Sequence, residues 1–284
     1  MRRFPCGLAV LGALGILLFR GAASEADFTI MPLGASTTYG GAAGFDIVPG
    51  GYRTRLYSDL HNAGYTFTFV GTVTENASPL LTQAGQTHHE GHPGYTIDQI
   101  ANNLDRNDGS GGNNGGLWFH KPAPPNIVLL LIGGSDILQN FQTATLAQRL
   151  DKLVGQIVAD SPTSVLFVSN LPPIKVFNAN QNQLQQAYNM QIRDVILPKY
   201  ESLGDNVIFV DQYANFVDAS GNFIHIGPDG IHPDQIGYDL MGDTWAAALQ
   251  QAAPVPEPTT LLLLGISTLG LIGCAWRGRK LVAG

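Results

Sequence analysis

The sequence contains very little cysteine, and none in its central part. Its two cysteines, Cys6 and Cys274, lie close to the two ends of the 284-residue chain. The stretch between them therefore cannot form an internal disulfide. A domain of this size is large enough to bury a hydrophobic core, so its stability is expected to come from packing rather than from covalent cross-links.

Positive charge is also scarce. The chain carries 15 Lys and Arg against 22 Asp and Glu, a formal net charge of −7. Several basic residues lie at the two ends, so residues 27–253 are more acidic still, at −11. Proteins that bind DNA or RNA usually present basic patches, and no nucleic-acid partner is expected here.

Long apolar runs are restricted to the two ends. At the start, Arg2 and Arg3 precede an apolar run at 8–19, which leads into small residues at 21–24. This order is typical of a secretory signal peptide, and residues 1–24 are interpreted as one. A membrane anchor is the alternative, but a run of about 12 residues is short for a helix that must cross about 30 Å of hydrocarbon.

The other end combines three features. Residues 255–258 read Val-Pro-Glu-Pro, an apolar stretch follows from Leu261 to Trp276, and a basic cluster occupies 277–280. The stretch is just long enough to cross a bilayer, and the basic cluster is expected to stay in the cytoplasm. In this order the three features resemble the PEP-CTERM sorting signal of Gram-negative bacteria.

That resemblance implies cleavage near Pro-Glu-Pro by an exosortase-type enzyme, followed by release or attachment at the cell surface. A permanent tail anchor is the alternative. Residues 254–284 are thus expected to be a sorting segment, and residues 27–253 a single exported domain. This domain would meet the membrane only through the terminal segments.

Between the ends, short β-branched runs alternate with helical patterns. The runs predict five buried strands, at 28–31, 67–70, 127–132, 165–168 and 207–210. The clearest helical pattern is an apolar stripe between Leu146 and Val158. This alternation predicts an α/β fold: a three-layer, doubly wound, five-stranded parallel sheet whose functional loops lie at the carboxyl ends of its strands.

A serine in a glycine-rich turn directly follows the first predicted strand. In the segment Gly34-Ala35-Ser36, the serine is expected to project from the carboxyl edge of the sheet. Taken alone this pattern is weak, because a serine in such a turn is more often a cap or a turn former. It makes Ser36 a candidate nucleophile.

A possible base for this nucleophile lies near the end of the domain. Asp229 and His232 are three residues apart, just before a helix predicted from about Gln235. Within one loop, Asp229 can accept a hydrogen bond from Nδ1 of the imidazole while Nε2 faces a serine, as triad chemistry requires. The alternative is a structural helix N-terminus, with Asp229 as a cap and Pro233 in the first turn.

Together with two further segments, these residues resemble the SGNH (GDSL-like) hydrolases, whose sequence blocks contribute Ser, Gly, Asn and His. The corresponding blocks are Gly34–Ser36, His92–Tyr95, Gly133–Asp136 and Asp229–His232, and their order and spacing match the family. A narrower similarity, to carbohydrate esterase family 3 with its acetylxylan esterases, rests on residues 30–34, 51–53, 89–100 and 132–134.

The resemblance implies a flavodoxin-like SGNH fold and a serine esterase that needs no cofactor or metal. Ser36 then corresponds to the nucleophile, His232 to its base and Asp229 to the acid that orients this base. The backbone N–H groups of Ser36 and Gly94, with the hydroxyl of Ser135, correspond to the oxyanion hole. The implied substrate is a small ester or an acetylated polysaccharide, hydrolysed through an acyl-enzyme.

Two residues depart from the family pattern. Ala35 replaces the Asp of the usual Gly-Asp-Ser, which is not a triad member. Ser135 stands where the family has an Asn whose side-chain amide completes the oxyanion hole. A serine hydroxyl has a shorter reach, and loss of one such donor lowers the rate by about 10²–10³-fold. A catalytically weak or inactive surface protein that binds polysaccharide on the same fold is therefore an open alternative.

Other titratable residues invite different interpretations. The run from His88 to His92 contains zinc-ligand types, but it lacks the helical His-Glu-x-x-His spacing, and no metal site is expected. His225 and Asp211 are interpreted as structural. A lipase, thioesterase or phospholipase role is disfavoured, because no long apolar lid segment is evident.

Overall fold

The computed structural model describes residues 28–42, 47–104, 118–120 and 124–252. The predicted signal segment, sorting segment and apolar tail lie outside this part of the chain. Within it, no helix is both long and apolar enough to span a membrane.

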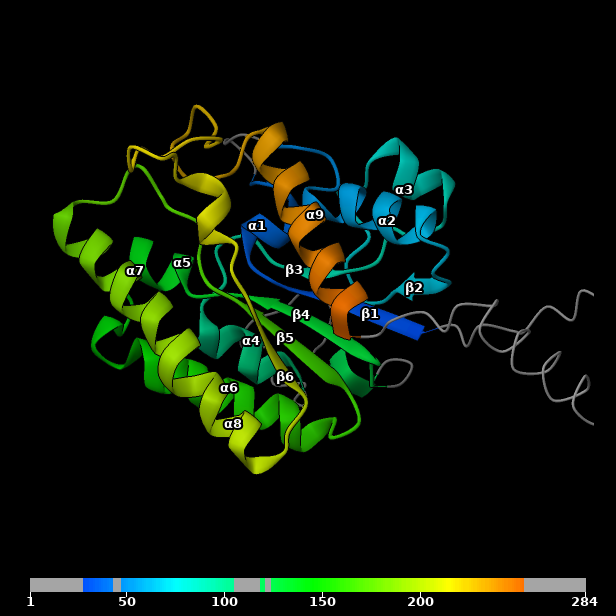
Figure 1. The fold of residues 1–284 in the computed structure, drawn as a ribbon, viewed down its shortest axis with the longest axis horizontal. Helices are drawn as coiled ribbons and strands as arrows, with labels where there is room; N and C mark the ends of the chain where they lie inside the picture. Colours follow the sequence, from blue (N-terminus) through cyan, green and yellow to red (C-terminus); the bar gives the residue numbers. More distant parts are fainter. Residues whose placement is uncertain (1–27, 43–46, 105–117, 121–123, 253–284) are drawn as a thin grey trace, which may run out of the picture.

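A parallel sheet forms the centre of the domain (Figure 1). Its main path runs in the order β2-β1-β4-β5-β6, and β3 pairs with the end of β1 on the side opposite β4. This is a doubly wound order, in which the direction of winding reverses between β1 and β4. The strands are β1 (Phe28–Gly34), β2 (Phe67–Phe69), β3 (Glu90–Gly91), β4 (Ile127–Leu131), β5 (Val165–Ser169) and β6 (Val207–Val210).

All five predicted strands are confirmed, with ends that differ by at most three residues. Strand β3, which is only two residues long, was not among the predicted strands. Its sequence, Glu90-Gly91, contains no β-branched or aromatic residue, although both residues are buried. Such a strand has no hydrophobic pattern by which it could be predicted.

Helices cover both faces of the sheet (Figure 1). On one face, α2 and α9 pack against each other. On the other, α4 contacts α6, which in turn contacts α7. The helices are α1 (Ser36–Tyr39), α2 (Tyr52–Asn62), α3 (Pro79–Gln83), α4 (Ile97–Leu104), α5 (Gly134–Leu138), α6 (Leu146–Asp160), α7 (Ala179–Gln191), α8 (Leu197–Leu203) and α9 (Gln235–Ala252).

Local sequence signals explain where the longer helices lie. The apolar stripe of α6 is buried from Leu146 to Ile157, as its spacing predicts. At the start of α7, Asn178 and Gln181 form a capping box, in which each side chain accepts a hydrogen bond from the other residue's backbone N–H. The helix predicted from about Gln235 is confirmed as α9.

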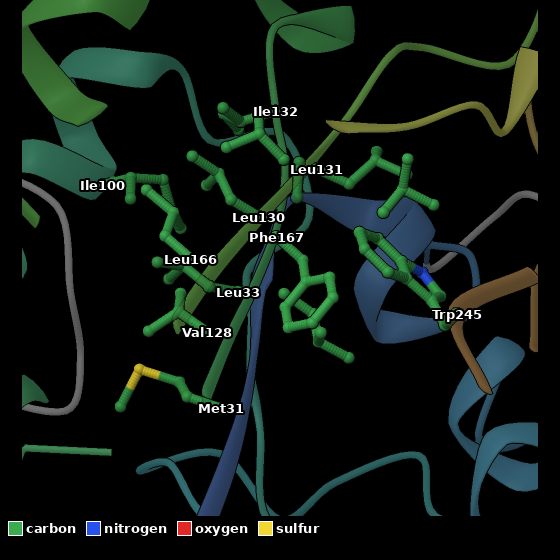
Figure 2. Packing of buried hydrophobic residues seen from close by; sticks show 14 of the residues in the cluster. Met31, Leu33, Ile100, Val128, Leu130, Leu131, Ile132, Leu166, Phe167 and Trp245 are labelled. Carbon is green, nitrogen blue, oxygen red and sulfur yellow. The ribbon is translucent and has the colours of Figure 1, made fainter. Parts of the chain in front are cut away.

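The hydrophobic core lies on both sides of the sheet (Figure 2). All five residues of β4 are buried, as expected for a central parallel strand covered on both faces. In Figure 2, Val128 and Leu130 lie toward Ile100 of α4, whereas Phe167 lies toward Trp245 of α9. The core thus fixes both helical layers relative to the carboxyl edge of the sheet.

Strands β1 and β4 approach each other closely where Gly34 pairs with Leu131. A Cβ atom at position 34 would overlap the carbonyl oxygen of Leu131 and lie 2.5 Å from Oγ1 of Thr38. Only glycine fits between these two groups.

Gly34→Ala is therefore expected to lower the free energy of unfolding by about 1–3 kcal/mol, the usual cost of overpacking. Urea unfolding measures this change. Gly134→Ala is the matched control, because its Cβ would meet no atom closer than Ile174, at 3.5 Å. An equal urea midpoint for Gly34→Ala and the unaltered protein would contradict the close approach of β1 and β4.

Candidate active site

A small cavity opens at the carboxyl edge of the sheet, where the winding reverses. Its volume is about 30 Å³, and segments that follow β1, β4 and β5 line it. The polar groups on its walls include Ser36 and Ser135, while Ile132 and Ile174 are among its apolar residues. Doubly wound sheets bind their ligands at this position.

Three side chains form a continuous hydrogen-bonded chain at this cavity. Nε2 of His232 lies 2.8 Å from Oγ of Ser36, and Nδ1 of His232 lies 2.6 Å from Oδ2 of Asp229. An ionised carboxylate can only accept, so Nδ1 carries a proton and Nε2 of the neutral imidazole accepts from the Ser36 hydroxyl. The structure thus brings together Ser36, His232 and Asp229.

The loop that precedes α9 holds Asp229 in its ionised form. Oδ1 of Asp229 accepts hydrogen bonds from the backbone N–H groups of Ile231, at 2.7 Å, and His232, at 2.9 Å. Burial alone would raise the pKa of Asp229. The hydrogen bonds from these two amides and from the imidazole outweigh burial, and they lower the pKa below its usual value. The carboxylate can therefore orient His232 at any pH near neutral.

The backbone of the short helix α1 holds Ser36. The amides of Gly40 and Gly41 donate to the carbonyl of Ser36, at 2.8 and 2.9 Å. Ser36 is the first residue of α1, a position at which the backbone N–H has no partner within the helix. The backbone N–H of Ser36 therefore makes no hydrogen bond within the helix, and it belongs to the same residue as the candidate nucleophilic hydroxyl.

The buried guanidinium of Arg53 binds the C-terminal residue of α1. Arg53 is fully buried and donates hydrogen bonds to the carbonyls of Tyr39, Asn76 and Thr87. Burial lowers the pKa of Arg53 to about 10, so the guanidinium remains charged at neutral pH. It ties the last residue of α1 to two loops that lie far from it in sequence.

Gly94 lies in a tight turn just after β3. The amide of Tyr95 donates to the carbonyl of His92, at 3.1 Å, and Gly94 has a φ of 82°. Pro at the second position and Gly with positive φ at the third are the pattern of a type II turn. Nε2 of Gln139 donates to the Gly94 carbonyl, at 2.7 Å. The turn is thereby held to the end of α5, although Gly94 is not among the residues that line the cavity.

Ser135 lies in α5 and is 6% exposed. The next residue, Asp136, is completely buried and connects this helix to two others. Its carboxylate accepts from Nη1 of Arg149 in α6, at 2.6 Å, and from the amide of Ile97 at the start of α4, at 3.2 Å. Burial raises the pKa of Asp136, against the opposing effect of Arg149.

Neither Asp136 nor Gln139 was a candidate from sequence. Asp136 adjoins Ser135 within the third block, and this adjacency was the one signal that could have identified it. Gln139 acts through a hydrogen bond to a segment 45 residues away, which no local pattern reveals.

The histidines of residues 88–92 make contacts that stabilise the fold. His89 accepts from the Gly91 amide through Nδ1, and burial, with the nearby charge of Arg53, holds the pKa of His89 well below its ordinary value. His92 lies 2.8 Å from the Glu90 carboxylate and stacks on Trp118. In the described part of the chain, no group of three His, Cys, Asp or Glu is placed to hold a metal.

The two remaining candidates lie away from the cavity. Asp211 accepts hydrogen bonds from Asn170 and from the amide of Ala214, as expected for a residue that ends a strand. His225 has a φ of 58°, and its carbonyl accepts from the amide of Asp234. These contacts give both residues roles in loop structure.

Comparison with known proteins identifies the domain. Residues 33–240 match the GDSL-like lipase/acylhydrolase family. The chain belongs to this family. Residues 254–280 match the PEP-CTERM protein-sorting motif. This GDSL-family domain is therefore an ester hydrolase domain, and the motif indicates export in a Gram-negative bacterium and processing by an exosortase.

Individual relatives support the narrower similarity to carbohydrate esterase family 3. A family 3 carbohydrate esterase from Clostridium thermocellum is 30% identical, with a TM-score of 0.62 over 80% of this chain and 96% of its own. One from Talaromyces cellulolyticus is 21% identical and shares the fold, with a TM-score of 0.59 over 79% of this chain and 97% of its own.

A multidomain esterase of Ruminococcus flavefaciens is 30% identical over 242 residues, which is 81% of this chain. The GDSL-family chain spans only 30% of the length of that relative. The predicted SGNH fold is confirmed by these matches together with the strand order.

Ionised Asp229 is expected to stabilise the fold over a defined pH range. Because folding lowers its pKa, its contribution is complete above the unfolded-state value of about 3.9 and declines as the pH falls through the lower folded-state value. The free energy of unfolding of Asp229→Asn should thus fall further below that of the unaltered protein near pH 6 than near pH 2.5. Urea unfolding at both pH values tests this. A difference that stays constant with pH would contradict it.

Proposed function

We propose that this protein is an exported serine esterase that removes acetyl groups from a polysaccharide through an acyl-enzyme. The observation that carries the proposal is the hydrogen-bonded chain from Asp229 through His232 to Ser36, which ends at a cavity. The identity of the domain as an ester hydrolase supports the same reaction. The catalytic roles given below are part of this proposal.

In the first half of the reaction, Oγ of Ser36 attacks the ester carbonyl. Nε2 of His232 takes the serine proton, and Asp229 stabilises the resulting imidazolium. The negative charge on the former carbonyl oxygen is met by the backbone N–H groups of Ser36 and Gly94 and by the Ser135 hydroxyl. His232 then returns the proton to the departing sugar oxygen, which leaves an acyl-Ser36.

In the second half, water replaces the alcohol. His232 removes a proton from this water, whose oxygen attacks the acyl carbonyl, and the same donors stabilise the second oxyanion. Collapse of this intermediate breaks the bond to Oγ of Ser36, which recovers its proton from His232. The products are a carboxylate and the deacylated alcohol.

The size of the cavity favours a short acyl group. A volume of about 30 Å³ is only about two to three times the roughly 10–15 Å³ needed for one water molecule. A methyl group fits such a space, whereas a long acyl chain would have to extend out of it. The similarity to a carbohydrate esterase of Clostridium thermocellum favours a sugar as the alcohol.

The ends of the chain define where this reaction takes place. We assign residues 1–24 to a cleaved signal peptide, residues 27–253 to the hydrolase domain and residues 254–284 to the sorting segment. Exosortase processing near Pro258 would leave the domain at the cell surface or release it. An acetylated polysaccharide is accessible at that location.

The oxyanion hole supports a second candidate function. Ser135 occupies the position of the family's Asn, and a shorter donor stabilises the oxyanion less. A weakly active or inactive protein that binds polysaccharide is the resulting alternative. The intact hydrogen-bonded chain of Asp229, His232 and Ser36 favours the enzyme, because binding alone does not require it.

Ser36→Ala and His232→Ala should each lower kcat on 4-nitrophenyl acetate by about 10⁴-fold or more, and the double variant should lose little beyond either single one. The reason is that the serine and its base act as one unit. Ser202→Ala, at an exposed serine of α8, is the control and should keep full activity. Ordinary turnover by folded Ser36→Ala would refute the assignment of the nucleophile.

Ser135→Asn should raise kcat and kcat/KM together, by up to about 10²-fold, because an amide reaches the oxyanion better than the hydroxyl does. Ser135→Ala is the matched variant and should lower both parameters. Steady-state kinetics on one acetyl ester compares the three proteins. An unchanged or lower kcat for Ser135→Asn would show that Ser135 is not a weakened donor.

A further inference from the structure

A second cleft lies beside the catalytic cavity, at the carboxyl ends of β5 and β6. Its volume is about 410 Å³, within the usual range for small-molecule sites. One wall comes from α7 and includes Gln186 and Met190, and the opposite wall includes Asp211 and Tyr213. Asn170 lies between them, after β5. We call this feature the distal cleft.

One short backbone segment separates the distal cleft from the catalytic cavity. Asn170 lines the cleft, and the next residue, Leu171, lines the cavity. Asn189, which also lines the cleft, binds both backbone polar groups of Leu171. Its Oδ1 accepts from the Leu171 amide, at 2.9 Å, and its Nδ2 donates to the Leu171 carbonyl, at 3.0 Å. The two sites therefore share a fixed wall.

The distance between the two sites follows from the sheet. Strands β5 and β6 are two and three positions from β1, and Ser36 follows the end of β1 by two residues. Neighbouring strands lie about 4.8 Å apart, so the cleft is roughly 10–15 Å from the nucleophile along the sheet edge. A single sugar ring cannot occupy both sites. A chain of linked sugars can.

The side chains of the distal cleft offer free hydrogen-bonding groups. Gln186 is exposed, and the structure records no hydrogen bond to its amide from any residue it describes. Asp211 uses Oδ1 for Asn170 and Ala214, while Oδ2 has no recorded partner in the described part of the chain. An amide and a carboxylate oxygen together can both donate to and accept from hydroxyl groups.

The cleft also contains an aromatic surface. The ring of Tyr213 is partly buried and packs edge to face against Phe223, with centroids 6.4 Å apart. Such a fixed, amphipathic ring provides a large contact area at a low cost in conformational entropy, and it suits the C–H face of a pyranose. A sugar ring has apolar C–H faces and an edge of hydroxyl groups. Tyr213 can contact such a face, while Gln186 and Asp211 can bind the hydroxyl groups.

The charges around the distal cleft disfavour an anionic ligand. Arg193 and Asp211 both line it, so a cation and an anion face the same space. Arg193 is already paired with the carboxylate of Asp194, at 2.7 Å. An anion such as phosphate would therefore meet no unpaired cation among the described residues that line the cleft. The backbone at Ile192–Ile196 forms one turn of π-helix, a feature found frequently at functional sites.

We propose that the distal cleft binds a sugar residue of a neutral polysaccharide chain whose acetylated residue lies at Ser36. The inference rests on the proposed function for the identity of the ester, but binding of the chain does not depend on catalysis. It assigns Gln186 and Tyr213 as contacts to the unreacted part of the substrate.

Calorimetric titration of the protein with unacetylated xylohexaose and cellohexaose tests the site directly. We expect at least one of the two to bind. Gln186→Ala should weaken this binding by about three- to tenfold, the worth of one hydrogen bond, and Tyr213→Ala by about tenfold. Gln183→Ala is the matched control, because this glutamine is also exposed on α7 but does not line the cleft. Its Kd should not change.

Binding of neither oligosaccharide would overturn the proposal, as would equal affinities for Gln186→Ala and Gln183→Ala. Kinetics adds an independent readout. On acetylated xylo-oligosaccharides, Gln186→Ala should raise KM and leave kcat unchanged, while its kinetics on 4-nitrophenyl acetate stay the same. If the unaltered protein hydrolyses neither ester, the proposed esterase function fails, and the titration still decides whether the cleft binds sugar.

Discussion

The pairing of β1 with β4 at Gly34 and Leu131 is the constraint on which the site depends. The chain turns away from the sheet within two residues of each strand end, toward Ser36 on one side and Ser135 on the other. Because the two strands are parallel and in fixed register, both turns open at the same edge. A side chain at position 34 would push the strands apart and separate Ser36 from Ser135.

The same edge divides into two halves with different chemistry. The part bounded by the segments after β1, β4 and β5 contains a tight cavity and the hydrogen-bonded chain of Ser36, His232 and Asp229. The half that follows β5 and β6 contains an open cleft with hydrogen-bonding groups and an aromatic ring. Asn189 fixes the wall between them by binding both polar groups of one peptide segment. If both proposals hold, the reaction and the recognition of a long substrate take place in separate parts of this edge.

Much of this architecture could be predicted from sequence, because its signals are local. The five longer strands are runs of apolar residues, and Asp229 and His232 share one loop whose spacing already allows the hydrogen bond between them. Strand β3 has no such signal, since it forms only because β1 offers an unpaired edge to Glu90-Gly91. The Gln139 bond to Gly94 and the link from Asp136 to Arg149 join distant segments. The distal cleft likewise combines α7 with the ends of β5 and β6.

The hydrogen bond between Ser36 and His232 joins residues that are 196 positions apart. Export machinery that threads a chain from its N-terminus delivers the serine among the first residues and the imidazole among the last. Until α9 docks against α2 and brings its preceding loop to the sheet edge, the serine hydroxyl is an ordinary alcohol with little nucleophilicity. In the proposed mechanism, an incompletely translocated or truncated chain would therefore lack esterase activity until the whole domain has folded.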